Sequence, residues 1–191
     1  MANIKVAIDF VLRQEDSTLS GEITTLPGDK GGPTRFGLAS TAHPELIASG
    51  YFDASKVSTT AALAIAEQVY AKQYANPLSI GAITDQAAAT AVLSLGINAG
   101  LIRAGRVLQK SCIALGHQVA SDGKIGPITI AAANACSADG LLAEYSKLAL
   151  AYYTALAQST PTDAPFLKGW TNRVAAWTHS AASLRAQALA G

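Results

Sequence analysis

Residues 4–15, IKVAIDFVLRQE, place an acidic residue at the end of an amphipathic helix. Apolar side chains recur here with the i, i+3, i+4, i+7, i+8 spacing of a helix that buries one face: Ile4, Ala7, Ile8, Val11 and Leu12. Glu15 takes the next position on that face. A carboxyl group held against a core or a cleft loses hydration and can keep its proton near neutral pH. The pattern predicts a proton donor at Glu15, with a solvated carboxylate beyond the helix as the alternative.

The composition and the hydrophobic pattern of the sequence change after Glu15. Residues 16–37 read DSTLSGEITTLPGDKGGPTRFG, where β-branched and apolar residues alternate with polar ones and glycines recur. This pattern predicts one or two short β-hairpins followed by a tight glycine loop. From Thr59 onward the apolar spacing is helical, with predicted helices over 101–115, 141–158 and 166–188 and another near Pro127. We expect a mainly α (α+β) fold with a small N-terminal β-hairpin lobe.

The composition restricts the class of protein. The chain has 191 residues, of which half are hydrophobic and 14% are charged, so it can fill the core of one domain, or of one domain with a closely docked second part. A net charge of +1 provides no general basic field, and we expect no nucleic-acid partner. The N-terminal residues do not resemble a signal peptide, and the apolar runs are too short to span a bilayer. We expect synthesis in the cytoplasm without stable membrane insertion.

The residues that most often bind metals are few and scattered. The three histidines, His43, His117 and His179, show no ligand spacing. Cys112 and Cys136 lie in alanine-rich helical sequence, where a buried free thiol is the usual state, although a disulfide stays open. We expect no metal or organic cofactor, and we expect a monomer.

An acidic helix end, a hairpin, and then Asp29, two glycines and Thr34 form a candidate catalytic arrangement. A glycosidase needs an acid that protonates the leaving oxygen and a second polar group that stabilises the sugar cation or assists water. The hairpin can fold Asp29 and Thr34 back across a cleft from Glu15. Gly31 and Gly32 permit a close turn, and we expect them to contribute to substrate binding. The alternative is a plain turn without chemistry. Thirteen residues separate Glu15 from Asp29, which permits either carboxyl spacing, so the stereochemical outcome stays open.

Three other residues are weaker candidates. Glu22 is a competing acid, but it lies in an alternating segment where exposure is the default. Asn98, in the segment LGINAG, is a candidate for substrate binding or for satisfying neighbouring backbone groups. Tyr70 precedes Tyr74 by one helical turn, and the pair is either a platform for sugar rings or, more commonly, part of the core.

These stretches carry a family resemblance. The runs FVLRQED (10–16) and GDKGGPTRFGLA (28–39) resemble the N-terminal signature of glycoside hydrolase family 108, an acidic helix end followed by a glycine loop. DGKIGPITIAAANA (122–135) and FLKGWTNRV (166–174) resemble the small peptidoglycan-binding region that follows the catalytic part in this family. The chain departs from the family pattern in a longer hairpin before the glycine loop, and in Lys30 and Ser94, where proline and aspartate are common.

The resemblance implies a lysozyme-like fold and hydrolysis of the β-1,4 bond between N-acetylmuramic acid and N-acetylglucosamine. It assigns the catalytic acid to Glu15, and it places Asp29 and Thr34 in the loop that positions water. In this interpretation residues 1–96 form the catalytic region and residues 97–191 a helical peptidoglycan-binding region, packed as one compact unit.

The expected partner is the glycan strand of peptidoglycan. The expected setting is the bacterial cell wall, reached as a phage or prophage endolysin after membrane permeabilisation, or through dedicated export. A non-catalytic peptidoglycan-binding protein and a lytic transglycosylase on the same fold are the alternatives.

Overall fold

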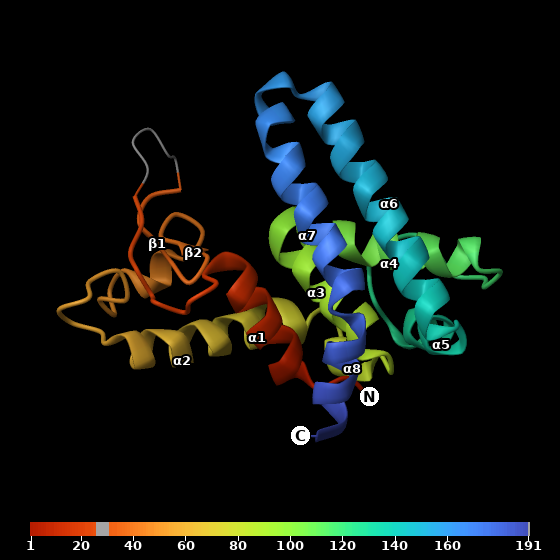
Figure 1. The fold of residues 1–191 in the computed structure, drawn as a ribbon, viewed down its shortest axis with the longest axis horizontal. Helices are drawn as coiled ribbons and strands as arrows, with labels where there is room; N and C mark the ends of the chain where they lie inside the picture. The colour runs from red at the N-terminus through yellow and green to blue at the C-terminus, as the bar shows by residue number, and fades with distance from the viewer. Residues whose placement is uncertain (26–30, 191) are drawn as a thin grey trace.

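The computed structural model describes residues 1–25 and 31–190, and within them it shows a mainly helical protein with a small β-hairpin (Figure 1). The predicted fold class is confirmed. The helices are α1 (Ile4–Glu15), α2 (Thr59–Tyr70), α3 (Gln86–Ala99), α4 (Leu101–Ala114), α5 (Pro127–Ala135), α6 (Ala138–Ser159), α7 (Leu167–His179) and α8 (Ala181–Ala190). The antiparallel strands are β1 (Thr34–Arg35) and β2 (Leu38–Ala39). Short 3-10 and π-helical turns are η1 (Pro44–Leu46), η2 (Ala71–Ala75), η3 (Ile80–Ala82) and η4 (Pro161–Phe166).

Helix α1 begins and ends where the apolar spacing predicts. Asn3 caps its start, because the Asn3 side chain accepts hydrogen bonds from the backbone N–H groups of Lys5 and Val6. The predicted apolar face is buried at Ala7, Ile8, Val11 and Leu12. This burial fixes the rotation of α1, and thereby the direction in which its last residue points.

Helix α3 is the buried centre of the molecule. Every residue from Gln86 to Gly96 is buried, so this helix is covered on all sides. Helix α1 packs against it from the N-terminal part of the chain, and α4, α6, α7 and α8 pack against it from the C-terminal part. The predicted boundary between residues 96 and 97 falls inside α3, so this one helix contributes to both predicted regions.

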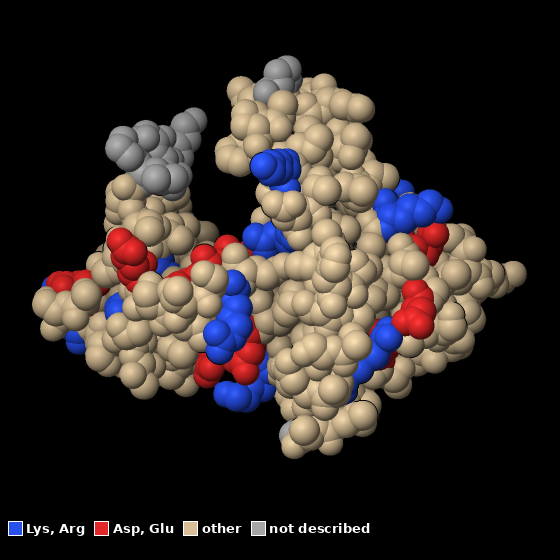
Figure 2. All heavy atoms as spheres, viewed as in Figure 1, with Lys and Arg blue, Asp and Glu red and all other residues tan. Residues whose placement is uncertain are grey.

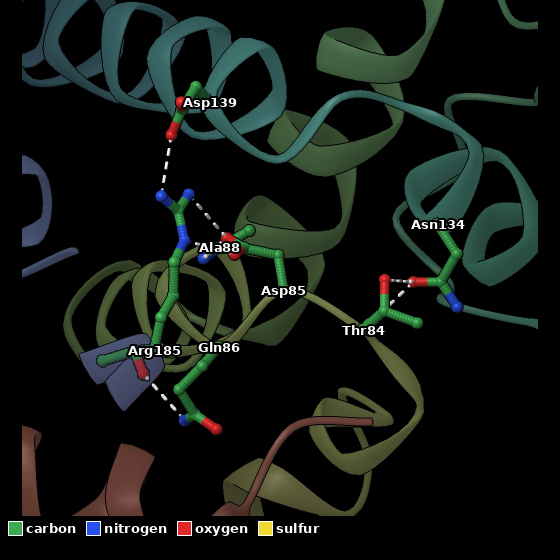
Figure 3. Close-up of polar contacts among 8 residues, drawn as sticks. Thr84, Asp85, Gln86, Ala88, Asn134, Asp139 and Arg185 are labelled. Carbon is green, nitrogen blue, oxygen red and sulfur yellow. Dashed lines mark hydrogen bonds and ion pairs between the residues drawn. The ribbon is translucent and has the colours of Figure 1, made fainter. Parts of the chain in front are cut away.

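Ion pairs connect the start of α3 to two later helices (Figure 3). Asp85 is the N-cap of α3, and its side chain accepts a hydrogen bond of 2.9 Å from the Ala88 N–H. Arg185 of α8 donates to Asp85 at 2.6 Å and to Asp139 of α6 at 2.8 Å. These bonds fix α8 against the body of the protein.

The hairpin lies later in the chain than the alternating pattern predicts. Among the described residues 16–25, only Thr24 pairs with a strand, through an isolated bridge to Thr34. The strands instead flank Phe36 and Gly37, whose φ angles are +48° and +75°. Two positive φ angles are typical of a two-residue type I′ turn. Because phenylalanine rarely adopts a positive φ angle, the sequence pattern did not indicate a turn at Phe36.

The predicted helix over 166–188 is also wrong in one respect. It is divided into α7 and α8 at Ser180, whose ψ of 0° departs from helical geometry. The other predicted helices of the second half, over 101–115, 141–158 and near Pro127, are confirmed as α4, α6 and α5.

A hollow lies between the two sides of the molecule. Helices α6 and α7 form a helical hairpin whose tip stands apart from the lobe of α1, α2 and the strands (Figure 1). The space-filling view is hollowed between these parts, with acidic and basic side chains near the floor (Figure 2). The C-terminal end of α1 points into this region.

Candidate active site

A polar cavity of about 350 Å³ opens at the end of α1. Its walls come from the turn after α1, from β1 and from the hairpin turn: Glu15, Asp16, Ser17, Thr18, Ser20, Glu22, Thr24, Thr34, Phe36 and Gly37. The fold therefore brings Glu15 and Thr34 to the same cavity. Asp29, the third predicted catalytic residue, lies outside the described residues.

Glu15 is paired with an arginine from the far end of the chain. Its Oε1 atom lies 2.9 Å from Nη1 of Arg173, on α7. The Glu15 side chain is 23% exposed and that of Arg173 is 15% exposed, so the pair is largely shielded but open to the cavity on one side. At this distance the guanidinium and the carboxyl group form a charge-assisted hydrogen bond. Arg173 belongs to the segment FLKGWTNRV, but the sequence assigns it no role at the site, because no local pattern shows which residue faces Glu15.

The hairpin turn supports Glu15 from another side. Gly37 has a φ of +75°, and a Cβ atom added there would lie 2.7 Å from Cγ of Glu15 and 2.6 Å from the hydroxyl of Tyr70. Both distances are too short for a real side chain. Gly37 is therefore required for the backbone conformation and for the close approach to Glu15.

Tyr70 lies beneath the cavity and not in its wall. Only 1% of it is exposed, and its hydroxyl donates a hydrogen bond of 3.0 Å to the carbonyl oxygen of Phe36. Burial, followed by the nearby charge of Glu15, raises the pKa of Tyr70 well above its ordinary value, so the phenol stays a neutral donor. In this position Tyr70 holds the hairpin turn, and direct contact with a sugar stays a prediction.

Asp16 organises the loop that follows Glu15. Its Oδ2 atom accepts hydrogen bonds from the Gly21 N–H at 2.8 Å and the Ser20 hydroxyl at 3.2 Å, while Oδ1 accepts from the N–H and hydroxyl of Thr18. Burial alone would raise the pKa of Asp16, but the hydrogen bonds from Gly21, Thr18 and Ser20 outweigh it and leave the pKa below its ordinary value of 3.8. Asp16 is thus an ionised structural acceptor.

Replacing Asp16 by asparagine is expected to destabilise the protein by about 1 kcal/mol at neutral pH. In the variant, an amide nitrogen takes the place of one carboxylate oxygen. It would face N–H or hydroxyl groups that donate hydrogen bonds to that oxygen in the parent protein. Because the folded-state pKa of Asp16 is lowered, its contribution is present above the unfolded-state value and is lost as the pH falls through the folded-state value. Urea unfolding of both proteins should therefore show a constant difference between pH 5 and 8 that shrinks below about pH 4. A difference that persists at pH 2 would contradict this role.

A buried arginine, also missed from the sequence, fixes the base of the hairpin. Arg35 is 1% exposed, and its guanidinium donates to the backbone carbonyl oxygens of Gly21, Tyr51 and Val57, each at 2.9 Å. The Tyr51 hydroxyl in turn donates to the Arg35 carbonyl oxygen at 3.1 Å. These bonds satisfy a charge that would otherwise be costly to bury, and they join the loop after α1 to the segment between η1 and α2.

The remaining predicted residues lie outside the wall of this cavity. The Gly31 carbonyl oxygen accepts a hydrogen bond of 2.9 Å from the Thr41 hydroxyl, and Gly32 has a φ of +68°. Both therefore shape the approach to β1. Asn98, at the end of α3, is exposed, and its Oδ1 accepts a hydrogen bond of 2.7 Å from the Tyr153 hydroxyl. Substrate binding by these three residues stays a prediction.

Residues 1–25 and 31–190 contain no cluster suited to a metal ion and no membrane-spanning helix. No group of three or more His, Cys, Asp or Glu side chains in this part could hold a metal ion. No helix in the same residues is long and apolar enough to cross a bilayer. Cys112 and Cys136 are free, and burial raises the pKa of the Cys112 thiol to about 12.

Two family models match the chain in succession. Residues 8–100 match glycosyl hydrolase 108, and residues 103–175 match a predicted peptidoglycan domain. The protein therefore carries a region that matches the glycosyl hydrolase 108 family, followed by one that matches a peptidoglycan domain. It is a glycoside hydrolase that acts on peptidoglycan, and the resemblance of its glycine loop and closing segment is confirmed.

A solved structure extends the likeness of this hydrolase to both halves. The structure titled "Structure of Brucella abortus SagA" is 28% identical, and the alignment covers 98% of this chain and 94% of that chain with a TM-score of 0.63. A comparison with curated proteins finds no match.

A second cavity in this hydrolase, of about 290 Å³, lies in the region that matches the peptidoglycan domain. Its wall includes Asp122, Lys124 and Gln109. Asp122 accepts hydrogen bonds of 2.8 Å from the Gln109 side chain and the Lys124 N–H, which lower its pKa. Its lining residues all lie outside residues 8–100, which match the hydrolase family, so the cavity at Glu15 is the better candidate for catalysis.

Proposed function

We propose that this hydrolase is a muramidase that cleaves the β-1,4 bond between N-acetylmuramic acid and N-acetylglucosamine. Glu15 donates a proton to the leaving glycosidic oxygen. The observation that supports this most directly is the placement of Glu15 at the rigid end of α1, in the wall of a polar cavity, on the domain that matches the hydrolase family.

The other polar groups of the cavity have distinct proposed roles. Thr34 helps to place the attacking water, since its hydroxyl lies in the same wall as Glu15. Asp29 orients that water or stabilises the developing oxocarbenium charge, as the family resemblance implies. Asp16 is unsuited to either role because loop hydrogen bonds occupy both of its oxygens. Glu22 is the competing carboxyl in this cavity.

The pairing of Glu15 with Arg173 has a consequence for proton donation. The guanidinium lies 2.9 Å from the carboxyl group that must carry the proton in the proposed step. A glycan strand that fills the cavity removes water from the exposed side of Glu15, and this desolvation favours the protonated form. The proposal thus requires that bound substrate, and not the fold alone, prepares the acid.

The products of digestion test the proposed bond and reaction. Purified peptidoglycan is incubated with the protein, and the soluble fragments are identified by mass spectrometry. We expect fragments that end in reducing N-acetylmuramic acid. Fragments that end in reducing N-acetylglucosamine would place the cleavage at the other bond, anhydro-muramic ends would indicate a lytic transglycosylase, and release of no fragments would indicate a binding protein.

We propose the bacterial cell wall as the place of action, with a phage or prophage endolysin as the biological setting. Membrane permeabilisation then provides access to the substrate. Gram-negative cells with a permeabilised outer membrane should lyse on addition of the protein, and intact cells should not.

A further inference from the structure

Arg173 joins the two family-matched regions at the proposed catalytic acid. It lies in the region that matches the peptidoglycan domain, and Glu15 lies in the hydrolase domain. Besides its 2.9 Å contact with Glu15, Nη1 of Arg173 lies 3.5 Å from Oε1 of Gln14. The Gln14 oxygen also accepts a hydrogen bond of 2.8 Å from the hydroxyl of Ser94, a fully buried residue of α3. One guanidinium thus contacts two consecutive side chains of α1.

We infer that Arg173 is a positioning residue for catalysis, so that the C-terminal region completes the active site and does more than bind the cell wall. This inference rests on the proposed function of Glu15. It assigns to Arg173 the task of fixing the direction in which the Glu15 carboxyl group points.

Glu15 needs such an external restraint. It is the last residue of α1, and the next residue, Asp16, already has extended backbone angles (φ −139°, ψ 95°). A side chain in the last turn of a helix has no following turn to pack against. The turn at Gly37 approaches only Cβ and Cγ of Glu15, which leaves the carboxyl end free to rotate without a contact of its own. A proton donor must be held near its target oxygen to be effective, so this freedom would lower the rate.

Arg173 is itself held firmly enough to act as that restraint. One turn before it, the ring of Trp170 stacks on that of Tyr153, with centroids 4.9 Å apart and an interplanar angle of 18°. One turn after it, Trp177 is completely buried. These contacts fix the rotation of α7 against α6 and α3, and therefore direct Arg173 toward the end of α1.

The test compares Arg173→Met with Arg173→Lys and with a matched control. Arg185→Met removes another ion pair between distant helices, at the start of α3, without contact to the cavity (Figure 3). For each variant, kcat and KM are measured on soluble glycan fragments of peptidoglycan, and the thermal midpoint is recorded. We expect Arg173→Met to lower kcat about tenfold or more with little change in KM. Arg173→Lys should restore part of kcat, and Arg185→Met should keep the parent kcat.

Several results would overturn the inference. It fails if Arg173→Met keeps the parent kcat, if its loss of kcat is matched by Arg185→Met, or if only KM rises, which would make Arg173 a binding residue. Should Arg173→Met fail to fold, the lysine variant decides, because the flexible lysine side chain lacks the planar guanidinium that holds Nη1 against both Gln14 and Glu15; a parent-like kcat there overturns the inference. Glu15→Gln separates the two proposals: retained activity in that variant refutes the proposed function itself, whereas its inactivity beside a fully active Arg173→Met refutes this inference alone.

Discussion

Replacing Glu15 by glutamine is expected to lower the rate of peptidoglycan hydrolysis by about 10²–10⁴-fold while the protein stays folded. The amide has nearly the same shape as the carboxyl group, and its oxygen can still accept a hydrogen bond from Arg173. It cannot supply an acidic proton to the leaving oxygen. The measurement is the loss of turbidity of a peptidoglycan suspension, with a thermal melt of each protein to show that folding is retained.

Glu22→Gln is the matched control, because Glu22 lies in the wall of the same cavity. Glu22 is exposed and comes from the loop after α1, without the rigid helical support that Glu15 has. We expect this variant to keep most of the parent activity. If the two results are exchanged, so that Glu22→Gln is inactive and Glu15→Gln is active, the proton donor is Glu22 and the assignment to Glu15 is wrong.

The parts of the site that local sequence determines were predictable. The apolar spacing of residues 4–12 predicts α1 and the direction of its last turn, and Glu15 does lie in the wall of a cavity. Turn-forming residues after α1 indicated that the chain folds back, and Thr34 does reach the same cavity. Both predictions depend on residues close together in the chain, where propensity and periodicity are informative.

The residues that hold the site in place were not predictable, since their roles depend on contacts between residues that are far apart in the sequence. Nothing in the sequence distinguishes Arg35 from a surface arginine, because the carbonyl oxygens around it come from two separate loops, one with Gly21 and one with Tyr51 and Val57. Arg173 is separated from Glu15 by nearly the whole chain, and helix packing alone brings them together. The position of the hairpin depends on Phe36, whose left-handed backbone is stabilised by tertiary contacts against its own preference, including the hydrogen bond from Tyr70 to its carbonyl oxygen. Such long-range compensation leaves no periodic signal in the sequence.

Gly37→Ala is expected to lower hydrolytic activity by about 100-fold, through displacement of Glu15 and not through loss of the acid. The new Cβ atom would lie 2.7 Å from Cγ of Glu15 and 2.6 Å from the Tyr70 hydroxyl, so at least one of these groups must move. Alanine at a φ of +75° also costs about 1–2 kcal/mol of folding stability. Activity and thermal midpoint are measured together, since the two effects have different causes.

Gly50→Ala separates backbone strain from displacement of the acid. Gly50 has the same φ of +75°, but a Cβ atom there would meet only the side chain of Lys56, at 3.0 Å, which is 69% exposed and free to move. We expect both alanine variants to lose similar stability and only Gly37→Ala to lose activity. If Gly37→Ala melts like Gly50→Ala and hydrolyses peptidoglycan at the parent rate, the turn does not position Glu15. Equal losses of activity in both variants would instead trace the defect to general destabilisation, because Gly50 shares the strain of Gly37 but not its contact with the carboxyl group.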